Sequence, residues 1–190
     1  MDNPLLQILS GIMPVSPELR QDFNNCLFSR TIRRKQILLK SGRDCDQMYF
    51  VVKGLLRAYY YDQKEEITNW FMREGDFAIS IHSFYLYELS TETIQALEDC
   101  ELLYISRADL DALYLKYVEL NIAGRKITSE YMCRIEARYK AIRKTTALER
   151  YQNLMRTRPD LISRVANQYI ATYLGMNMET LSRLKRQLMQ

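Results

Sequence analysis

The hydrophobic pattern of this chain changes near Ser106, and that change limits the folds that the chain can adopt. Before this point, residues 29–105 contain short runs of β-branched and aromatic residues at roughly ten-residue spacing, separated by turn residues. Such runs predict an antiparallel β-sandwich or barrel. After it, apolar residues recur at helical spacing to the end of the chain. The chain is therefore expected to belong to the α+β class.

Short helices are expected before the β-rich module, over residues 3–10 and 16–28. In the second, Ser16 can cap the helix and Pro17 suits its first position. After the module, Ser106 with an acidic residue three positions on predicts another helix start, because side-chain oxygens there accept from unpaired N–H groups.

A longer helix is expected over residues 118–143. Its apolar stripe consists of Ile122, Ile127, Tyr131, Ile135, Tyr139 and Ile142. This stripe must be buried, either on the β-rich module of its own chain or against the same helix of a second subunit. A helix over 146–156 should follow, ended by Pro159, and the segment RVANQY (164–169) is expected to be a short strand or an extended lead.

The last stretch, residues 167–190, reads as two short helices joined at a glycine. Gly175 can end the first helix in a left-handed conformation, and the Asn177 side chain can cap the second. The apolar positions are Ile170, Ala171 and Leu174 in the first helix, and Met178, Leu181, Leu184 and Leu188 in the second. Two amphipathic helices joined this way form either an ordinary helical hairpin or a helix-turn-helix that reads DNA.

The distribution of charge favours the DNA-reading alternative. Residues 140–190 contain 10 basic and 3 acidic residues, a net charge of +7, whereas residues 1–139 carry a net charge of −3. Basic residues gathered around a helix-turn-helix are typical of nucleic-acid binding. The candidate DNA-binding residues are Gln168, Asn177, Met178, Glu179, Thr180, Ser182, Arg183, Lys185 and Arg186.

Composition argues against several other classes of protein. No apolar run is long enough to span a membrane, and the N-terminus lacks the basic start of a signal peptide, so a cytoplasmic location is expected. The four cysteines are scattered and His82 is the single histidine, which leaves no metal or haem site and predicts no cofactor. With no nucleophile–base pair or glycine-rich phosphate loop, the chain is not expected to be an enzyme.

The order of these segments resembles the Crp/Fnr transcription regulators over nearly the whole chain. SGRDCDQMYFVVKGLLRAYY matches the family's glycine-turn-strand-glycine pattern through Gly42 and Gly54, and EGDFAIS resembles the start of its phosphate-binding cassette at Gly75. ATYLGMNMETLSRLKRQ resembles the family's reader helix, with Glu179 and Arg183 on base-contacting positions. The resemblance implies a double-stranded β-helix (jelly roll) with flanking helices, a long dimerisation helix and a C-terminal winged-helix-like module with a minimal wing.

The cyclic-nucleotide contacts of that family are not reproduced. Aligned with the family, Ser90 stands at the position of the phosphate-binding arginine, Thr91 at that of the hydroxyl and Ser80 near that of the ribose-binding glutamate. Binding of cAMP by the usual contacts is therefore not expected. Thr128 and Ser129 match a pair that contacts adenine in the family. The aromatic segment SIHSFYLYELSTET either leaves a pocket for another ligand or fills it, and a filled pocket is favoured.

These observations predict a sensor module over residues 1–117, a dimerisation helix over 118–143 and a DNA-binding module over 144–190. The expected function is sequence-specific transcription regulation by a homodimer on double-stranded DNA, with RNA polymerase as a further candidate partner and an effector whose identity is open. The candidate effector residues are Ser80, Ser90, Thr91, Thr128 and Ser129. The alternative is a ligand-sensing or protein-interaction module with a vestigial DNA reader.

Overall fold

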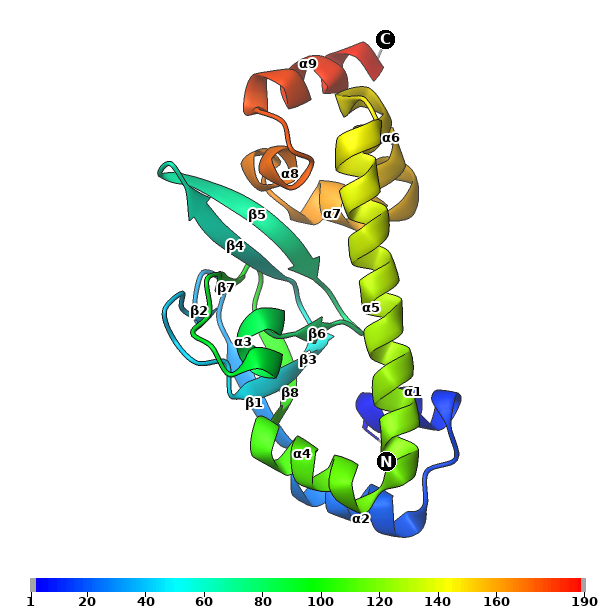
Figure 1. Cartoon of the computed structure of the whole chain (residues 1–190). Helices are drawn as coiled ribbons and strands as arrows, with labels where there is room; N and C mark the ends of the chain where they lie inside the picture. The colour runs from blue at the N-terminus through cyan, green and yellow to red at the C-terminus, as the bar shows by residue number, and fades with distance from the viewer. Residues whose placement is uncertain (1–2, 189–190) are drawn as a thin grey trace.

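The computed structural model describes residues 3–188 and places a β-sandwich beside one long helix, with smaller helices at both ends (Figure 1). The strands are β1 (Phe28–Ile32), β2 (Ile37–Leu39), β3 (Gln47–Lys53), β4 (Leu56–Asp62), β5 (Glu65–Met72), β6 (Phe77–Ala78), β7 (Thr93–Ala96) and β8 (Cys100–Ser106). They form two four-stranded sheets in the orders β1-β8-β3-β6 and β2-β7-β4-β5, with antiparallel pairing throughout. The sandwich predicted over residues 29–105 is therefore present.

The helices precede, interrupt and follow these strands. They are α1 (Pro4–Ile12), α2 (Pro17–Asn25), α3 (Ile81–Leu86), α4 (Arg107–Lys116), α5 (Val118–Lys144), α6 (Ala147–Thr157), α7 (Pro159–Arg164), α8 (Asn167–Tyr173) and α9 (Met178–Leu188). Two predicted caps are confirmed, because the Ser16 hydroxyl accepts from the N–H of Leu19 and the Ser106 hydroxyl accepts from the N–H of Asp109. Helix α3 lies within the aromatic segment and was not predicted.

The core of the sandwich is formed by alternate residues of facing strands. Strands β3 and β8 pair from Gln47 opposite Ser106 through Val51 opposite Leu102, and the inward side chains of both sheets are almost fully buried. The turn between β3 and β4 requires Gly54, which has a φ of +100° and would place a Cβ only 2.6 Å from the Asp99 carbonyl oxygen. A side chain cannot be accommodated there without displacing the backbone of the neighbouring β7–β8 turn.

Helix α5 runs alongside the sandwich and extends beyond it towards the C-terminal helices (Figure 1). Its predicted apolar stripe divides between two environments. Ile127 and Tyr131 are half-buried against the sandwich, where the Tyr131 hydroxyl accepts from the N–H of Phe77 at 2.8 Å. The remaining stripe positions, Ile122, Ile135, Tyr139 and Ile142, are exposed. The stripe is thus covered only in part by its own chain.

The C-terminal helices pack on the outer face of the second sheet through α8, which lies against β5. Phe71 of β5, 1% exposed, belongs to the same apolar cluster as Leu161 and Ile170 and lies 4.9 Å from the ring of Tyr173. Beside this cluster, the Arg57 guanidinium lies between the rings of Tyr59 and Tyr169, at 4.0 and 3.7 Å from their centroids. We call the contact between α8 and β5, which includes Phe71, Ile170 and Tyr173, the seam.

Of the two alternatives predicted for residues 164–169, the short strand is wrong, and the extended lead is found only at Val165 and Ala166. Arg164 ends α7, Val165 and Ala166 form a two-residue extended link, and Asn167 begins α8. Pro159 explains the difference, because proline suits the first position of a helix and so begins α7 directly after α6 ends. The minimal wing expected after α9 falls on residues outside the described range.

Candidate nucleic-acid interface and effector cavity

Helices α8 and α9 are joined by a tight turn whose geometry follows from two residues, Gly175 and Asn177. Gly175 has a φ of +63°, and the N–H of Met176 donates to the Ala171 carbonyl at 3.0 Å, which closes the end of α8. The Asn177 side-chain oxygen then accepts from the N–H of Thr180 at 2.8 Å and caps α9. The sequence had predicted both roles, and both are confirmed.

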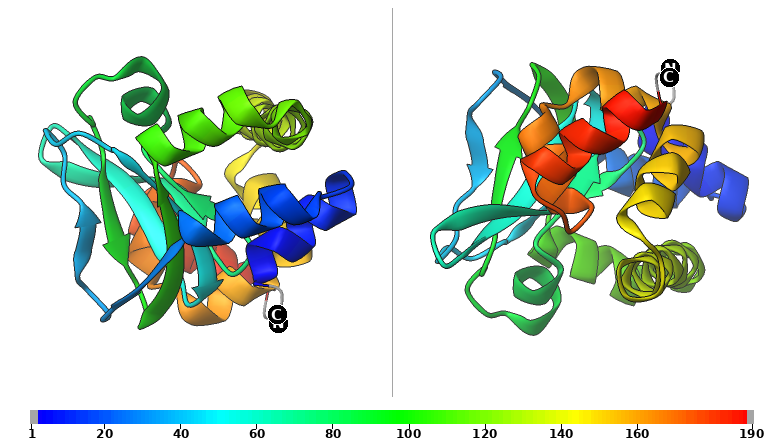
Figure 2. Two further views of the ribbon diagram at one scale, coloured as in Figure 1. Left: turned by 90° about the horizontal axis from the view of Figure 1, so that it is seen from below. Right: turned by 90° about the horizontal axis from the view of Figure 1, so that it is seen from above.

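Helix α9 has one buried face and one exposed polar face. Leu181 and Leu184 pack into the C-terminal cluster, whereas Thr180 and Lys185 are half-buried and the Lys185 ammonium donates to the side-chain oxygen of Asn167. The exposed candidates on α9 and its cap are Asn177, Met178, Glu179, Ser182, Arg183 and Arg186. Gln168 is exposed on the first turn of α8. In the view from above, no other part of the described chain covers the outward side of α9 (Figure 2, right).

Two of the four apolar positions that the periodicity places on one face of α9 are not buried. Met178 is 45% exposed and Leu188 is 38% exposed. Met178 follows the cap directly and Leu188 ends the described helix, so both lie beyond the stretch that α8 and α6 can cover. The buried anchor of α9 is therefore limited to Leu181 and Leu184, and Met178 adds an apolar side chain to the exposed face.

A set of ion pairs flanks the apolar part of the seam. The Arg164 guanidinium at the end of α7 reaches Glu74 at 2.8 Å and Glu98 at 2.6 Å, both on turns of the sandwich. Arg73 pairs with Asp160 of α7 at 2.8 Å. The hydrogen bonds that Arg164 donates lower the pKa of Glu74 to about 2, and acceptance of these bonds by Glu98 and Glu74 raises the pKa of Arg164. The C-terminal helices are thus fixed to the sandwich by both apolar and ionic contacts.

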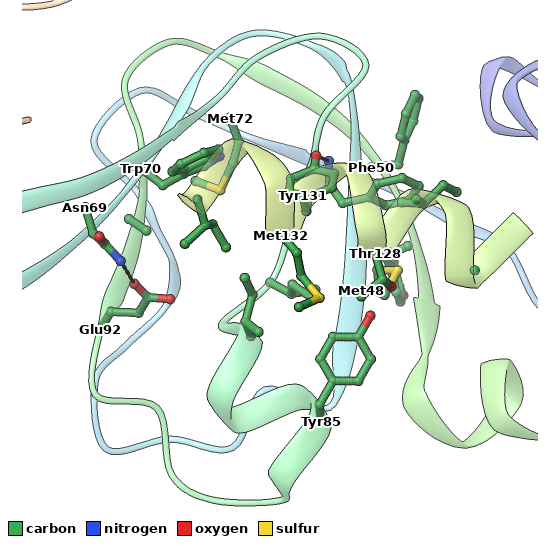
Figure 3. A pocket seen from close by; sticks show the side chains of 18 of the residues that line it. Met48, Phe50, Asn69, Trp70, Met72, Tyr85, Glu92, Thr128, Tyr131 and Met132 are labelled. Atoms are coloured by element: carbon green, nitrogen blue, oxygen red, sulfur yellow. Dashed lines mark hydrogen bonds between the residues drawn. The ribbon is translucent and has the colours of Figure 1, made fainter. Parts of the chain in front are cut away.

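A cavity of about 550 Å³ lies between the sandwich and α5. Figure 3 shows side chains from both sheets, from α3 and from α5 converging on it. Its apolar and aromatic walls include Met48, Phe50, Trp70, Met72, Tyr85 and Met132. At the end of the cavity nearest the C-terminal helices, the lining includes Thr172 and Gly175, next to the turn between α8 and α9. The expectation of a filled pocket is wrong, because the side chains of α3 do not fill this space: Tyr85 lines it and Leu86 is 58% exposed.

The predicted effector residues are not brought together around this cavity. Thr128 lines it, but Ser129 is exposed and is not part of the lining. Ser80 and Ser90 are buried in the sandwich, and Thr91 is exposed on the loop before β7. The Ser90 hydroxyl donates to the Glu92 carbonyl at 2.7 Å, so it holds the loop itself. Of the five candidates, only Thr128 therefore lines the cavity.

Sequence reasoning missed Glu92, whose carboxylate lines the cavity beside Asn69 (Figure 3). The Asn69 amide donates to Glu92 at 3.3 Å. Burial raises the pKa of Glu92, and hydrogen bonds from Asn69 and Ser80 oppose that shift. The signal in the sequence was weak: Glu92 directly precedes β7 and is two and four residues before the apolar Ile94 and Ala96, a spacing that places it on the same side as these residues.

Comparison with known proteins agrees with this architecture. Residues 29–117 match the family described as cyclic nucleotide-binding domain. No functionally curated protein matches the chain in sequence. Among residues 3–188, no helix combines the length and apolar character needed to cross a membrane.

Three solved structures share the fold at low sequence identity. A protein from Eubacterium rectale described as a transcriptional regulator of the Crp/Fnr family is 17% identical, with a TM-score of 0.72 over 94% of this chain and 88% of that chain. FixK2 from Bradyrhizobium japonicum is 19% identical, with a TM-score of 0.69 over 85% and 84%. The c-di-GMP responsive regulator CLP from Xanthomonas campestris is 17% identical, with a TM-score of 0.69 over 92% of each chain.

Proposed function

Because this Crp/Fnr-like chain joins a cyclic nucleotide-binding domain to the overall fold of those regulators, we propose that it is a sequence-specific DNA-binding transcription regulator. The observation that carries the proposal is the exposed polar face of α9, fixed at one end of the molecule by the Gly175 turn and the Asn177 cap. Its side chains offer donors and acceptors to base edges and phosphates.

In this proposal the chain divides into a sensor module (1–117), a dimerisation helix (118–143) and a DNA-binding module (144–190). The strand orders β1-β8-β3-β6 and β2-β7-β4-β5 support a jelly-roll sensor. Helices α8 and α9 act as the two helices of a helix-turn-helix, with α9 entering the major groove.

The proposed DNA contacts follow from the positions along α9. Arg183 pairs with a guanine and Glu179, one helical turn before it, accepts from a cytosine amino group. Thr180, Lys185 and Arg186 contact the backbone or flanking bases, as do Gln168, Asn177, Met178 and Ser182. Affinity is expected to fall steeply with salt, because phosphate contacts release counterions.

Two copies of the chain are proposed to pair through α5. The exposed apolar side chains of this helix support pairing, since Met132 is 64% and Tyr139 57% exposed in a single chain. Pairing would cover them and place two α9 helices about 34 Å apart on a near-palindromic site. In this proposal the cavity under α5 holds a small-molecule effector, RNA polymerase is a further partner, and the protein works in the cytoplasm without catalysing a reaction.

Selection of double-stranded DNA from a random pool, followed by gel shift, tests this function. We expect enrichment of a near-palindromic sequence and loss of its shift by Arg183→Ala. Absence of sequence-selective binding would contradict the proposal. If ligands still bound to the cavity, that outcome would favour a sensing module with a vestigial DNA reader.

A further inference from the structure

The cavity under α5 combines aromatic walls with one carboxylate. Trp70, Tyr85, Tyr104 and Tyr131 contribute rings to a lining that is otherwise made mainly of aliphatic and methionine side chains. The Glu92 carboxylate joins this lining from the loop that leads into β7, opposite α5 (Figure 3). Aromatic faces and a carboxylate are the two groups that proteins use to bind organic cations.

Glu92 is held in place by side-chain hydrogen bonds from Asn69 and Ser80. One of its oxygens accepts from the Asn69 amide at 3.3 Å, a long hydrogen bond. Burial disfavours its charged form, so its pKa is raised. A cationic group beside it would favour the ionised carboxylate and would replace the solvation lost on burial.

The cavity offers little to an anion. Arg138 is the single Lys or Arg in its lining within the described chain, and its guanidinium lies 3.8 Å from the centroid of the Tyr173 ring in α8. Ser90 stands at the position where the resemblance places a phosphate-binding arginine. Its polar atoms form hydrogen bonds within the surrounding loops. A phosphate at this end of the cavity would therefore meet the Glu92 carboxylate without a compensating cation.

From these contacts we infer that the cavity binds a small apolar amine, with its ammonium group received by Glu92 and its apolar body enclosed by the aromatic and methionine walls. The inference rests on the proposed function, because it identifies the class of the effector. It departs from the cyclic nucleotides that the domain's description suggests. Asn69 acts as a positioning residue that orients the Glu92 carboxylate.

The protein carries its own reporter for this test. Trp70 is the single tryptophan of the chain and lines the cavity, so selectively excited tryptophan emission reads out occupancy. Suitable probes are amantadine, adamantane carboxylate and adamantanol, which share one compact apolar body and differ in charge, with cAMP as a fourth ligand. The variants are Glu92→Gln, which keeps the shape and removes the charge, and Glu101→Gln, a matched control at an exposed surface pair with Lys53.

We expect amantadine to change Trp70 emission saturably, with an affinity at least about tenfold above those of adamantane carboxylate and cAMP. Glu92→Gln should weaken amantadine binding by about tenfold or more and leave adamantanol unchanged, and Glu101→Gln should match the wild type. Tighter or equal binding of cAMP or the carboxylate would overturn the inference. So would the absence of an amantadine response or an unchanged affinity in Glu92→Gln.

Comparison of the four probes on the wild-type protein tests the inferred preference for an amine even if Glu92→Gln fails to fold. It requires no DNA, so its failure is distinguishable from failure of the proposed function. A chain that binds DNA selectively but prefers anionic probes would keep the function and lose the amine effector. A chain that prefers amantadine without selective DNA binding would show the reverse.

Discussion

The outward face of α9 and the cavity under α5 are built from opposite chemistry. The first is exposed, polar and cationic, with Arg183 and Arg186 uncovered, whereas the second is enclosed by apolar side chains around the Glu92 carboxylate. A polyanion that suits the helix is repelled by the carboxylate, and an apolar ligand that suits the cavity has nothing to bind on the helix. The two sites therefore suit different ligands, and the seam between α8 and β5 packs the C-terminal helices against the sandwich.

The largest effect is expected from Phe71→Ala, which breaks the seam between the two regions. Phe71 is 1% exposed and contacts the C-terminal cluster and the Tyr173 ring, so its truncation should destabilise the protein by about 3–5 kcal/mol. Denaturant unfolding measures this loss. Phe28→Ala, at a residue that is 51% exposed, is the control and should cost far less. Equal losses in both variants would mean that the seam is not a packed core.

Arg183→Ala tests the exposed polar face of α9 separately from the cavity. Loss of one bidentate base contact should weaken binding to the selected duplex by about 10- to 100-fold, which corresponds to about 1–3 kcal/mol. Fluorescence anisotropy of a labelled duplex measures the affinity. Arg33→Ala removes an equal charge from an exposed turn of the sandwich and should leave the affinity nearly unchanged. If both variants lose affinity equally, Arg183 contributes through its charge alone and not through contact with a base.

Gly175→Ala tests the turn that fixes α9. A Cβ at this position would meet Ile142 at 3.9 Å, an ordinary contact, so the cost comes from the φ of +63° and should be about 1–2 kcal/mol. The matched change Gly11→Ala lies in α1 with open space around it and should be neutral or stabilising. Thermal unfolding of both variants gives the comparison. A stabilising Gly175→Ala would contradict the left-handed turn.

The smallest effect concerns the ionic part of the seam. The pKa of Glu74 is about 2 in the folded protein against an ordinary value of 4.5, so its pairing stabilises the fold above about pH 4.5. That contribution is lost as pH falls from 4.5 towards 2. Because Glu74 is 41% exposed, solvent screening limits it to about 1 kcal/mol.

Stability measured across this pH range should therefore fall in the wild type with a slope that Arg164→Ala reduces. Lys53→Ala, which breaks an exposed pair with Glu101, is the control and should keep the slope. An unchanged slope in Arg164→Ala would assign the acid sensitivity to other carboxylates.

The sequence predicted the features that depend on neighbouring residues. The caps at Ser16, Ser106 and Asn177 and the left-handed Gly175 follow from local hydrogen bonding and backbone sterics, and each is found in the structure. The β-rich region was likewise visible, because strand alternation is a local signal.

What the sequence did not predict depends on contacts between distant segments. Arg57 would ordinarily be assigned to the surface, yet it is 1% exposed because Gln95, Glu66 and the Tyr169 ring surround it. The resemblance directed attention to Ser80, Ser90 and Thr91, none of which lines the cavity, and away from Glu92, whose position in the cavity depends on how the second sheet faces α5. Such placements require the packed structure.

The specificity ratio of the chain tests the central claim most directly. This ratio is the affinity for the selected duplex divided by the affinity for a scrambled duplex of the same length, measured at the same salt concentration. A DNA reader of the proposed kind should favour the selected duplex by about 1,000-fold or more at physiological salt. Equal affinities for the two duplexes would contradict sequence-specific reading by α9.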